Sequence, residues 1–241
     1  MRAAVAVERR TGYFAPRGSS SVPLAARVNL FTSLALAACS GGAGGLETGP
    51  KHDPANSPEA ASVCPKEWEQ AKAAREQAVA DETEPSQQAA TRAVLAQAEC
   101  EREALTRWPM PAREHAEVLT RVKEARSTHR DTANLYTEVA RSTTAELALA
   151  GRLGLGQLHL SFATLLARVP DPTDMPPDEQ IEFRGEVREL VVHFHAEAER
   201  ELAAVVDASL AQRGDAAADA LRLAACVALT SIDSAVAGCR D

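Results

Sequence analysis

The feature that most restricts the fold of this chain is a series of alanine-rich, helix-forming segments that prolines and glycines separate from residue 64 onward. Alanine makes up about a fifth of the 241 residues, well above its usual share, while aromatic residues make up only 4%. Alanine is the best helix former, and no segment alternates apolar and polar residues as a half-buried strand does. The sequence therefore predicts an all-α fold of about six antiparallel helices that form hairpins.

Proline, glycine and capping residues place the ends of the expected helices. Ser86 is expected to cap the second helix, and Thr143 with Glu146 has the T-x-x-E spacing of a capping box at the start of the fourth. Gly214 is expected to end the fifth helix. The expected helices are 66–82, 86–107, 112–141, 143–169, 178–213 and 215 onward.

Small and apolar residues that recur at steps of three and four predict the buried faces. The fourth helix is the most apolar and is expected at the centre of the core, with glycines 151, 154 and 156 where another helix approaches its backbone. His129 is expected to be a partly buried, hydrogen-bonded histidine and not a metal ligand. The expected faces are Ala93, Ala96, Cys100 and Ala104 in the second helix, Val118, Val122, Ala125, His129, Ala133, Tyr136 and Val139 in the third, and Leu221, Leu223, Val227 and Ile232 in the last.

A short apolar run, Val28 to Ala38, ends directly before Cys39 and bears on how the chain is processed. A membrane-spanning helix needs about 20 apolar residues, so this run is too short to be one. With Arg27 before it, the run has the length and charge of the hydrophobic region of a secretory signal. A buried helix of a soluble domain is the alternative, although the glycine-rich segment 41–45 that follows is typical of a flexible tether. Residues 1–21 make a long leader, so the natural start could lie later, for instance at Val22.

The residues Leu36 to Cys39 resemble the lipobox of bacterial lipoproteins. The resemblance implies cleavage before Cys39, lipidation of its sulfur and acylation of the new N-terminus, and more than one acyl chain gives a stable anchor. In many such proteins an aspartate after the cysteine causes retention in the inner membrane. Ser40 occupies that position here, which favours the outer membrane, facing the periplasm. The predicted organisation is a signal peptide (1–38), a lipidated cysteine with a flexible tether (39–63) and a helical domain (64–241).

The charge of the chain disfavours two classes of partner. The net charge is −8, and removal of residues 1–38, which carry five arginines and one glutamate, would make it −12. Nucleic acid is not an expected partner because binding it needs a basic face. Peripheral binding to anionic lipid is disfavoured too, which leaves the lipid anchor as the expected membrane contact. The acidic residues are interspersed with arginines, a pattern typical of a solvated helix surface.

The remaining cysteines are even in number and are expected to form disulfides in an oxidising compartment. A hairpin that turns at 83–85 would bring Cys64 and Cys100 to the same end, which favours that pair and leaves Cys226 with Cys239. On one straight helix, Cys226 and Cys239 would be about 20 Å apart, whereas a disulfide needs Cα atoms about 4–7 Å apart. The last helix must therefore end between them, near 230–231. Zinc is the alternative for four cysteines, but no Cys-x-x-Cys spacing is present.

The segment 156–163 (GQLHLSFA), with Pro170 and Pro172 after it, resembles a helical repeat of tetratricopeptide-like periplasmic proteins of gliding bacteria. His159 stands where that pattern has tyrosine, and residues 182–184 fit the opening of its next helix. The match covers about 145–212. It implies a protein-binding scaffold, although any hairpin rich in alanine and leucine gives a similar pattern. The residues to which it assigns a packing role are Gly156, Leu158, Phe162, Ala163 and Pro170.

Histidines beside acidic residues in the fifth expected helix are the remaining candidates for chemistry. His193 and His195 would point about 200° apart on a helix and so cannot chelate one metal ion together. His195 and Glu199 share a face, but no matching set of ligands is evident on other helices. A solvated acidic face is therefore expected, with no metal and no cofactor. An enzyme is not expected either, because neither G-x-S-x-G nor the haem motif C-x-x-C-H is present.

Together these features predict a membrane-anchored lipoprotein of the cell envelope whose helical domain is a scaffold for other envelope proteins. The alternative is a helical bundle that binds a metal or a small ligand. A curved stack of hairpins would favour the scaffold, and a closed bundle with inward histidines and glutamates would favour the ligand binder.

Overall fold

The structure, a computed structural model, describes residues 64–110, 113–212, 214–232 and 238–239. The expected signal peptide, Cys39 and the tether lie outside these residues. The described residues form α-helices and no strand, which confirms the predicted all-α fold. None of their helices is both long enough and apolar enough to span a membrane. The helices are α2 (Pro65–Asp81), α3 (Glu84–Thr106), α4 (His115–Ala140), α5 (Ala145–Ala167), α6 (Pro177–Leu210) and α7 (Ala216–Thr230).

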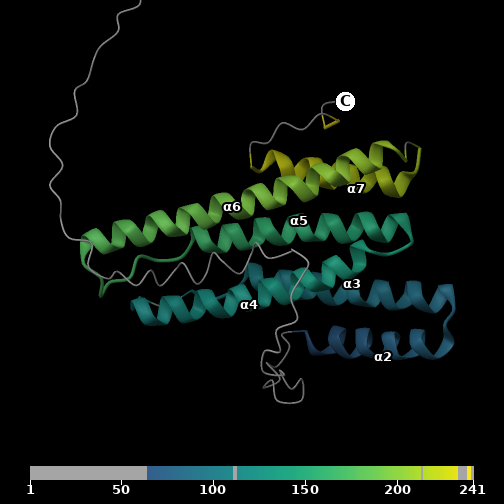
Figure 1. The fold of residues 1–241 in the computed structure, drawn as a ribbon, viewed down its shortest axis with the longest axis horizontal. Helices are drawn as coiled ribbons and strands as arrows, with labels where there is room; N and C mark the ends of the chain where they lie inside the picture. The colour runs from purple at the N-terminus through teal and green to yellow at the C-terminus, as the bar shows by residue number, and fades with distance from the viewer. Residues whose placement is uncertain (1–63, 111–112, 213, 233–237, 240–241) are drawn as a thin grey trace, which may run out of the picture. The chain divides into compact units, whose positions relative to one another are not determined.

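Consecutive helices run antiparallel and pack side by side (Figure 1). Helix α5 occupies the middle, because it packs against α3 and α7 as well as against its chain neighbours α4 and α6. Helices α4 and α6 both cover α5, yet none of their Cα atoms come within 8 Å of each other. The domain is therefore a stack of helical hairpins in which α5 contacts both α3 and α7.

Helix α5 is at the centre of the core, as its apolar sequence predicts. Twelve of its 23 residues are buried. Its first half shares a cluster with α6 and α7, while a smaller cluster of Ala71, Val94 and Val139 joins α2, α3 and α4. The buried members of the larger cluster are Leu149, Leu153, Leu202, Val205, Val206, Ala218, Ala225, Cys226 and Leu229.

Three glycines of α5 lie where neighbouring helices approach its backbone, which confirms their predicted role. Real Cβ atoms essentially never come within 3.0 Å of another residue's heavy atoms in this setting. A Cβ on Gly151 would lie 2.5 Å from the backbone nitrogen of Ala140. A Cβ on Gly154 would lie 2.0 Å from Cε1 of Tyr136, and a Cβ on Gly156 would lie 2.7 Å from Cγ of Leu202.

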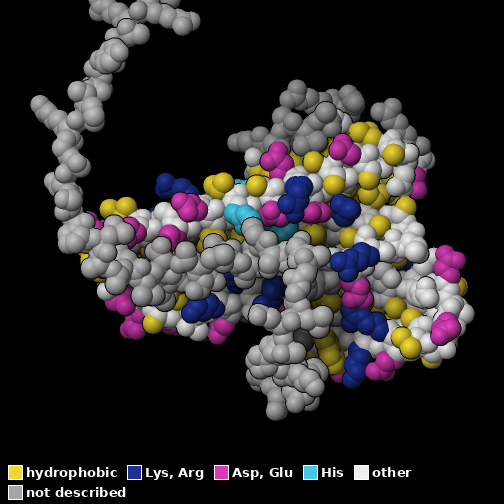
Figure 2. All heavy atoms as spheres, viewed as in Figure 1, with side chains coloured by type: hydrophobic (Ala, Val, Ile, Leu, Met, Phe, Trp, Pro, Cys, Tyr) yellow, Lys and Arg dark blue, Asp and Glu magenta, His cyan; other side chains and the backbone are white. Residues whose placement is uncertain are grey.

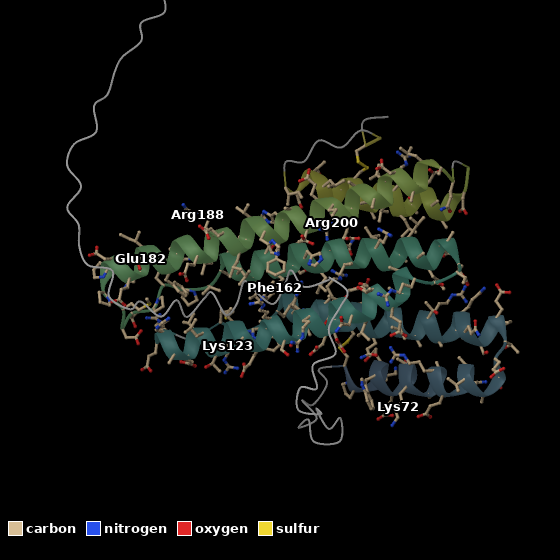
Figure 3. The ribbon with its side chains drawn as sticks, in the orientation of Figure 1. Lys72, Lys123, Phe162, Glu182, Arg188 and Arg200 are labelled. Atoms are coloured by element: carbon tan, nitrogen blue, oxygen red, sulfur yellow. A yellow bond between two sulfur atoms is a disulfide. The ribbon has the colours of Figure 1, made fainter. Side chains whose placement is uncertain are left out.

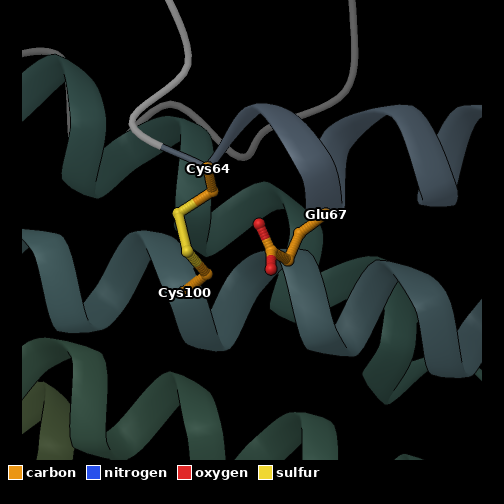
Figure 4. Close-up of side chains that lie close together, drawn as sticks. All are labelled: Cys64, Glu67 and Cys100. Atoms are coloured by element: carbon orange, nitrogen blue, oxygen red, sulfur yellow. A yellow bond between two sulfur atoms is a disulfide. The ribbon is translucent and has the colours of Figure 1, made fainter.

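Both expected disulfides are present. Cys64–Cys100 joins the start of α2 to α3, and Cys226–Cys239 joins α7 to the C-terminal segment, with Cα separations of 6.1 and 5.4 Å. Helix α7 ends at Thr230, so the helix stops where this pairing requires. Glu67 lies beside the first disulfide (Figure 4), but the two sulfurs are bonded to each other and supply no thiolate for a metal ion.

Two of the predicted helix starts are wrong. Thr83, and not Ser86, caps α3, and its Oγ1 accepts a hydrogen bond from the backbone nitrogen of Ser86 at 3.4 Å. The helix begins earlier because proline is well suited to its first turn. Helix α5 follows Thr144, whose side chain makes no capping hydrogen bond, so the box expected from Thr143 and Glu146 does not cap it.

The turn from α6 to α7 agrees with the sequence in part. Helix α6 ends at Leu210 with Ala211 as its C-cap, so Gly214 does not end the helix as predicted, although its φ of 93° is a conformation that favours glycine. Asp215 caps α7, since its carboxylate accepts hydrogen bonds from the backbone nitrogens of Ala217 and Ala218.

The buried face of α3 differs from the predicted one. Ala96 is exposed and Ala93 is half-buried, whereas Val94 and Ala98 are buried. The buried face is thus shifted by about one residue along the sequence from the predicted one. Alanines occur on every side of this helix, so their spacing does not define which side is buried. The stripe of α4 is confirmed, except that Thr132 is buried in place of Ala133.

The face of α7 is also different from the predicted one. Leu223 and Val227 are 66% and 64% exposed, although they are large apolar residues. Ala218 and Ala225 are buried instead, because the close approach of α6 leaves room for small side chains.

Replacing Gly154 with alanine tests the close contact between α5 and α4. The new Cβ would enter the ring of Tyr136, so the free energy of unfolding should fall by about 2 kcal/mol, a usual cost of overpacking. Gly185 of α6 is the matched control, because a Cβ there meets nothing within 4 Å. Gly185→Ala should raise the free energy of unfolding by up to about 1 kcal/mol through helix propensity. Urea denaturation followed by circular dichroism measures both, and equal effects would contradict the close packing.

Candidate functional site

Two histidines on neighbouring helices face each other inside the domain. His129 lies on the buried face of α4 and His159 on that of α5, and they are only 6% and 8% exposed. Nε2 of His129 lies 3.1 Å from Nδ1 of His159, so one of these nitrogens donates a hydrogen bond to the other. The predicted buried position of His129 is confirmed, and His159 is the partner that satisfies its polar ring.

Two phenylalanines enclose this histidine pair. Phe162 of α5 stacks on His129 with ring centroids 4.6 Å apart, and it lies in the seam between α5 and its neighbours (Figure 3). Phe194 of α6 meets the edge of His129 at 5.0 Å and that of Phe162 at 4.8 Å. The pair therefore lies in a largely apolar site formed by α4, α5 and α6.

Burial lowers the pKa of both histidines, because an apolar site disfavours the charged imidazolium. The pKa is about 3 for His129, where His159 and the guanidinium of Arg126 act in the same direction as burial. It is about 4 for His159, where the carboxylate of Glu197 opposes the effect of burial. Both rings are therefore neutral at pH 7, and each carries one N–H and one lone pair.

Helix α6 places polar side chains along one flank of the pair. Glu197 forms an ion pair with Arg200, in which Nη1 lies 3.0 Å from Oε1. His193 is exposed, and its ring centroid lies 5.1 Å from that of Phe194. The charges of Arg200 and His193 both lower the pKa of His159. Histidine side chains are visible on this face of the molecule (Figure 2).

A second polar network lies further along α4. Nε of Arg102 donates a hydrogen bond to the hydroxyl of Tyr136 at 3.3 Å. Nη2 of the same arginine donates a hydrogen bond to Oε2 of Glu99 at 2.5 Å. Tyr136 is fully buried, and burial raises the pKa of its hydroxyl. Because its ring occupies the space left by Gly154, this network is a structural link between α3, α4 and α5.

Most of the residues assigned to the repeat motif are buried in the core. Leu158, Phe162 and Ala163 are fully buried, Gly156 faces α6, and Pro170 is half-buried after α5 ends. Phe162 is the one that also belongs to the candidate site. No pattern in the sequence indicates that His129 and His159 meet, because they lie on separate helices and only the tertiary packing sets the register between those helices.

Neutral imidazoles in such a site have two possible chemical roles. They can take up protons when the pH falls, or they can offer lone pairs to a metal ion. Comparison of the chain with protein-family models, with curated proteins and with solved structures finds no match.

The histidine pair predicts a loss of stability in mild acid. A histidine in the unfolded chain has a pKa of about 6.5, whereas the folded values are about 3 and about 4. Between pH 6.5 and about 4 the unfolded chain binds more protons, so the free energy of unfolding falls as the pH is lowered. At pH 5 each histidine should lower it by about 2 kcal/mol relative to pH 7.5. Urea denaturation at a series of pH values measures this slope.

The double variant His129→Gln/His159→Asn is the control for that slope. Glutamine and asparagine place amide groups near the positions of Nε2 and Nδ1, so they can hydrogen-bond but do not titrate. The decrease in stability between pH 7.5 and pH 5 should be smaller in this variant by about 4 kcal/mol. An unchanged slope would show that other groups cause the acid sensitivity.

Proposed function

We propose that this protein is a lipoprotein of the cell envelope whose helical domain is an interaction scaffold for other envelope proteins. Cys39, after its lipobox-like residues, would carry the lipid anchor, and segment 40–63 would be the tether. The observation that carries the scaffold role is an exposed apolar face on α7.

This α7 face consists of residues that recur at steps of four, three and four along one side of the helix. Each of them is exposed, and the two largest, Leu223 and Val227, are among the most exposed large apolar residues described. Single apolar residues on a surface are ordinary, but a continuous row of them is typical of a binding surface. The residues of the α7 face are Ala216, Ala220, Leu223 and Val227.

The described C-terminal residues lie on a different side of α7. Nη1 of Arg222 donates a hydrogen bond to the carbonyl oxygen of Gly238 at 2.9 Å. Cys239 is bonded to Cys226, on the same side of the helix as Arg222. The α7 face therefore remains exposed among the described residues.

The position of α7 in the stack supports this role. In stacked helical hairpins each unit buries its apolar face on the next, and a terminal unit normally has a polar outer face. Helix α7 packs against α5 and α6 but has an apolar outer face, so a helix of a partner could pack there in the same way. The acidic charge of the chain favours a partner with basic residues around that contact.

The disulfides support the proposed location. Disulfides persist in oxidising compartments such as the bacterial periplasm and are rare in the cytosol. Four of the five cysteines of the chain form two disulfides, and the fifth is Cys39. A chain exported and anchored through Cys39 would have this division of its cysteines.

Chemical cross-linking in intact cells tests the scaffold role. The full chain should capture a reproducible partner, and the double variant Leu223→Glu/Val227→Glu should lose it because charges replace the apolar face. Val79→Glu is the matched control, since Val79 is 77% exposed but lies on α2, away from α7. A partner retained by the double variant, or the recovery of none, would contradict the role of the α7 face.

Cell fractionation tests the anchor. Cys39→Ser should release the protein from the membrane fraction, because serine cannot accept the thioether-linked lipid and the described helices provide no span. Metabolic labelling with a fatty acid should mark the wild-type chain and not the variant. If the variant stays in the membrane after a carbonate wash, the proposed anchor is wrong.

A further inference from the structure

The disulfide that joins α2 to α3 has a carboxylate beside it. Sγ of Cys64, Sγ of Cys100 and a carboxylate oxygen of Glu67 all lie within 4.8 Å of one another, and Figure 4 shows the three side chains together. No other three histidine, cysteine or acidic side chains of the described residues bring one ligand atom each this close together. Cys64 precedes α2 and Glu67 is in its first turn, so the spacing of three residues places both on one side of the helix.

Reduction of this disulfide would convert its two sulfurs into metal ligands. A dithiol adds two electrons and two protons to the S–S bond, which gives the thiols of Cys64 and Cys100, and is itself oxidised to a cyclic disulfide. The thiolate is the form of cysteine that binds a metal ion. Cys64 is the N-cap residue of α2, where the positive end of the helix dipole stabilises a negative charge.

We propose that Cys64, Glu67 and Cys100 bind one zinc ion when the disulfide is reduced and release it when the disulfide forms again. Thiolate sulfur and carboxylate oxygen are both ligands of Zn²⁺, and binding displaces one proton from each thiol. Zinc–sulfur bonds of about 2.3 Å and zinc–oxygen bonds of about 2.0–2.2 Å place tetrahedral ligand atoms about 3.6–3.8 Å apart. Rotation of the two cysteine side chains can separate the sulfurs to this distance, and the carboxylate oxygen is already close.

A cavity beside the disulfide gives a reductant and a metal ion access to the sulfurs. Its volume is about 420 Å³, and both cysteines line it together with Trp108 and residues from the end of α3. The cavity has room for water, which takes the fourth position in zinc sites that have three protein ligands.

Contacts other than the disulfide hold α2 in place. Nη2 of Arg75 lies 2.8 Å from Oε2 of Glu138 on α4, and Ala71 is buried in the cluster shared with α3 and α4. Among the described residues, no salt bridge involves Glu67, so its carboxylate does not have to leave a cation. The three ligands should therefore stay near one another when the S–S bond is broken.

The site would make zinc binding depend on the compartment. In a reducing compartment the chain would hold zinc, and in an oxidising one it would hold the disulfide. The exchange would accompany export if the chain is exported, and this consequence alone rests on the proposed function. Zinc binding by the reduced chain does not depend on the location of the protein.

Calorimetric titration of the reduced chain with zinc chloride tests the site. The full chain with Cys39→Ser, which removes a thiol outside the site, is reduced with dithiothreitol and freed of it under nitrogen. The reduced chain should bind one Zn²⁺, and the oxidised chain should bind none at these cysteines. A reduced chain without stoichiometric zinc, or equal binding by the oxidised chain, would overturn the proposal.

Reoxidation tests the release of the metal ion. Diamide takes two electrons from the two thiolates and two protons from the solvent, so the disulfide forms again and the ion loses two ligands. A colorimetric zinc chelator should then detect one released ion per chain. Zinc that stays bound after the thiols have disappeared would contradict the ligand set.

The second disulfide provides a matched control, because reduction frees its two thiols as well. No third ligand among the described residues joins Cys226 and Cys239. The variant Cys226→Ser/Cys239→Ser should therefore bind zinc as its parent does, whereas Cys64→Ser/Cys100→Ser should lose stoichiometric binding. Loss in the first variant or retention in the second would overturn the assignment.

Two glutamates of α2 separate a specific site from unspecific binding. Glu67→Gln should weaken zinc binding by about tenfold or more, since even the loss of an outer-shell group has effects of this size. Glu69→Gln removes an exposed carboxylate that points about 200° away from Glu67, so binding should be unchanged. The reduced chain should keep its helical circular dichroism spectrum. Equal effects of the two substitutions, as an unfolded reduced chain would give, would overturn the proposal.

Discussion

The close approach of α4 and α6 to the backbone of α5 is the constraint on which the rest of the domain depends. Gly151, Gly154 and Gly156 leave no space for a side chain against α4 and α6. Contacts this close compensate for a core that contains many alanines and few aromatic rings, because small side chains bury enough surface only when helices approach closely. They also fix where each residue of α4 meets α5. The ring of Tyr136 fills the space at Gly154, and this register brings His129 opposite His159 one to two turns away.

The buried polar groups make this register specific. An unpaired imidazole inside the domain would cost about 1–3 kcal/mol, whereas the facing pair satisfies one nitrogen of each ring. A shift of α4 along α5 by one turn would separate both the histidines and the link from Tyr136 to Arg102. The apolar core favours compact packing in general, and these two polar contacts favour one alignment of the helices.

Helix α6 connects the face of α7 to the buried histidine pair. Its C-terminal half packs against α7, and its Phe194 contacts His129 and His159. The Cα atoms of α4 and α6 do not come within 8 Å of each other, so side chains bridge the two helices.

The sequence by itself determined the helical class, the number of helices among the described residues, the central place of α5, the role of its glycines and both disulfide pairs. These follow from local propensity and from distances along a helix, which do not depend on the tertiary packing. It did not determine which side of α3 or α7 is buried, because alanine occurs on all sides of both helices and gives no clear period. Nor did it show that His129 and His159 would meet. Their meeting depends on the register and rotation of two separate helices, and only the packing of side chains between these helices decided it.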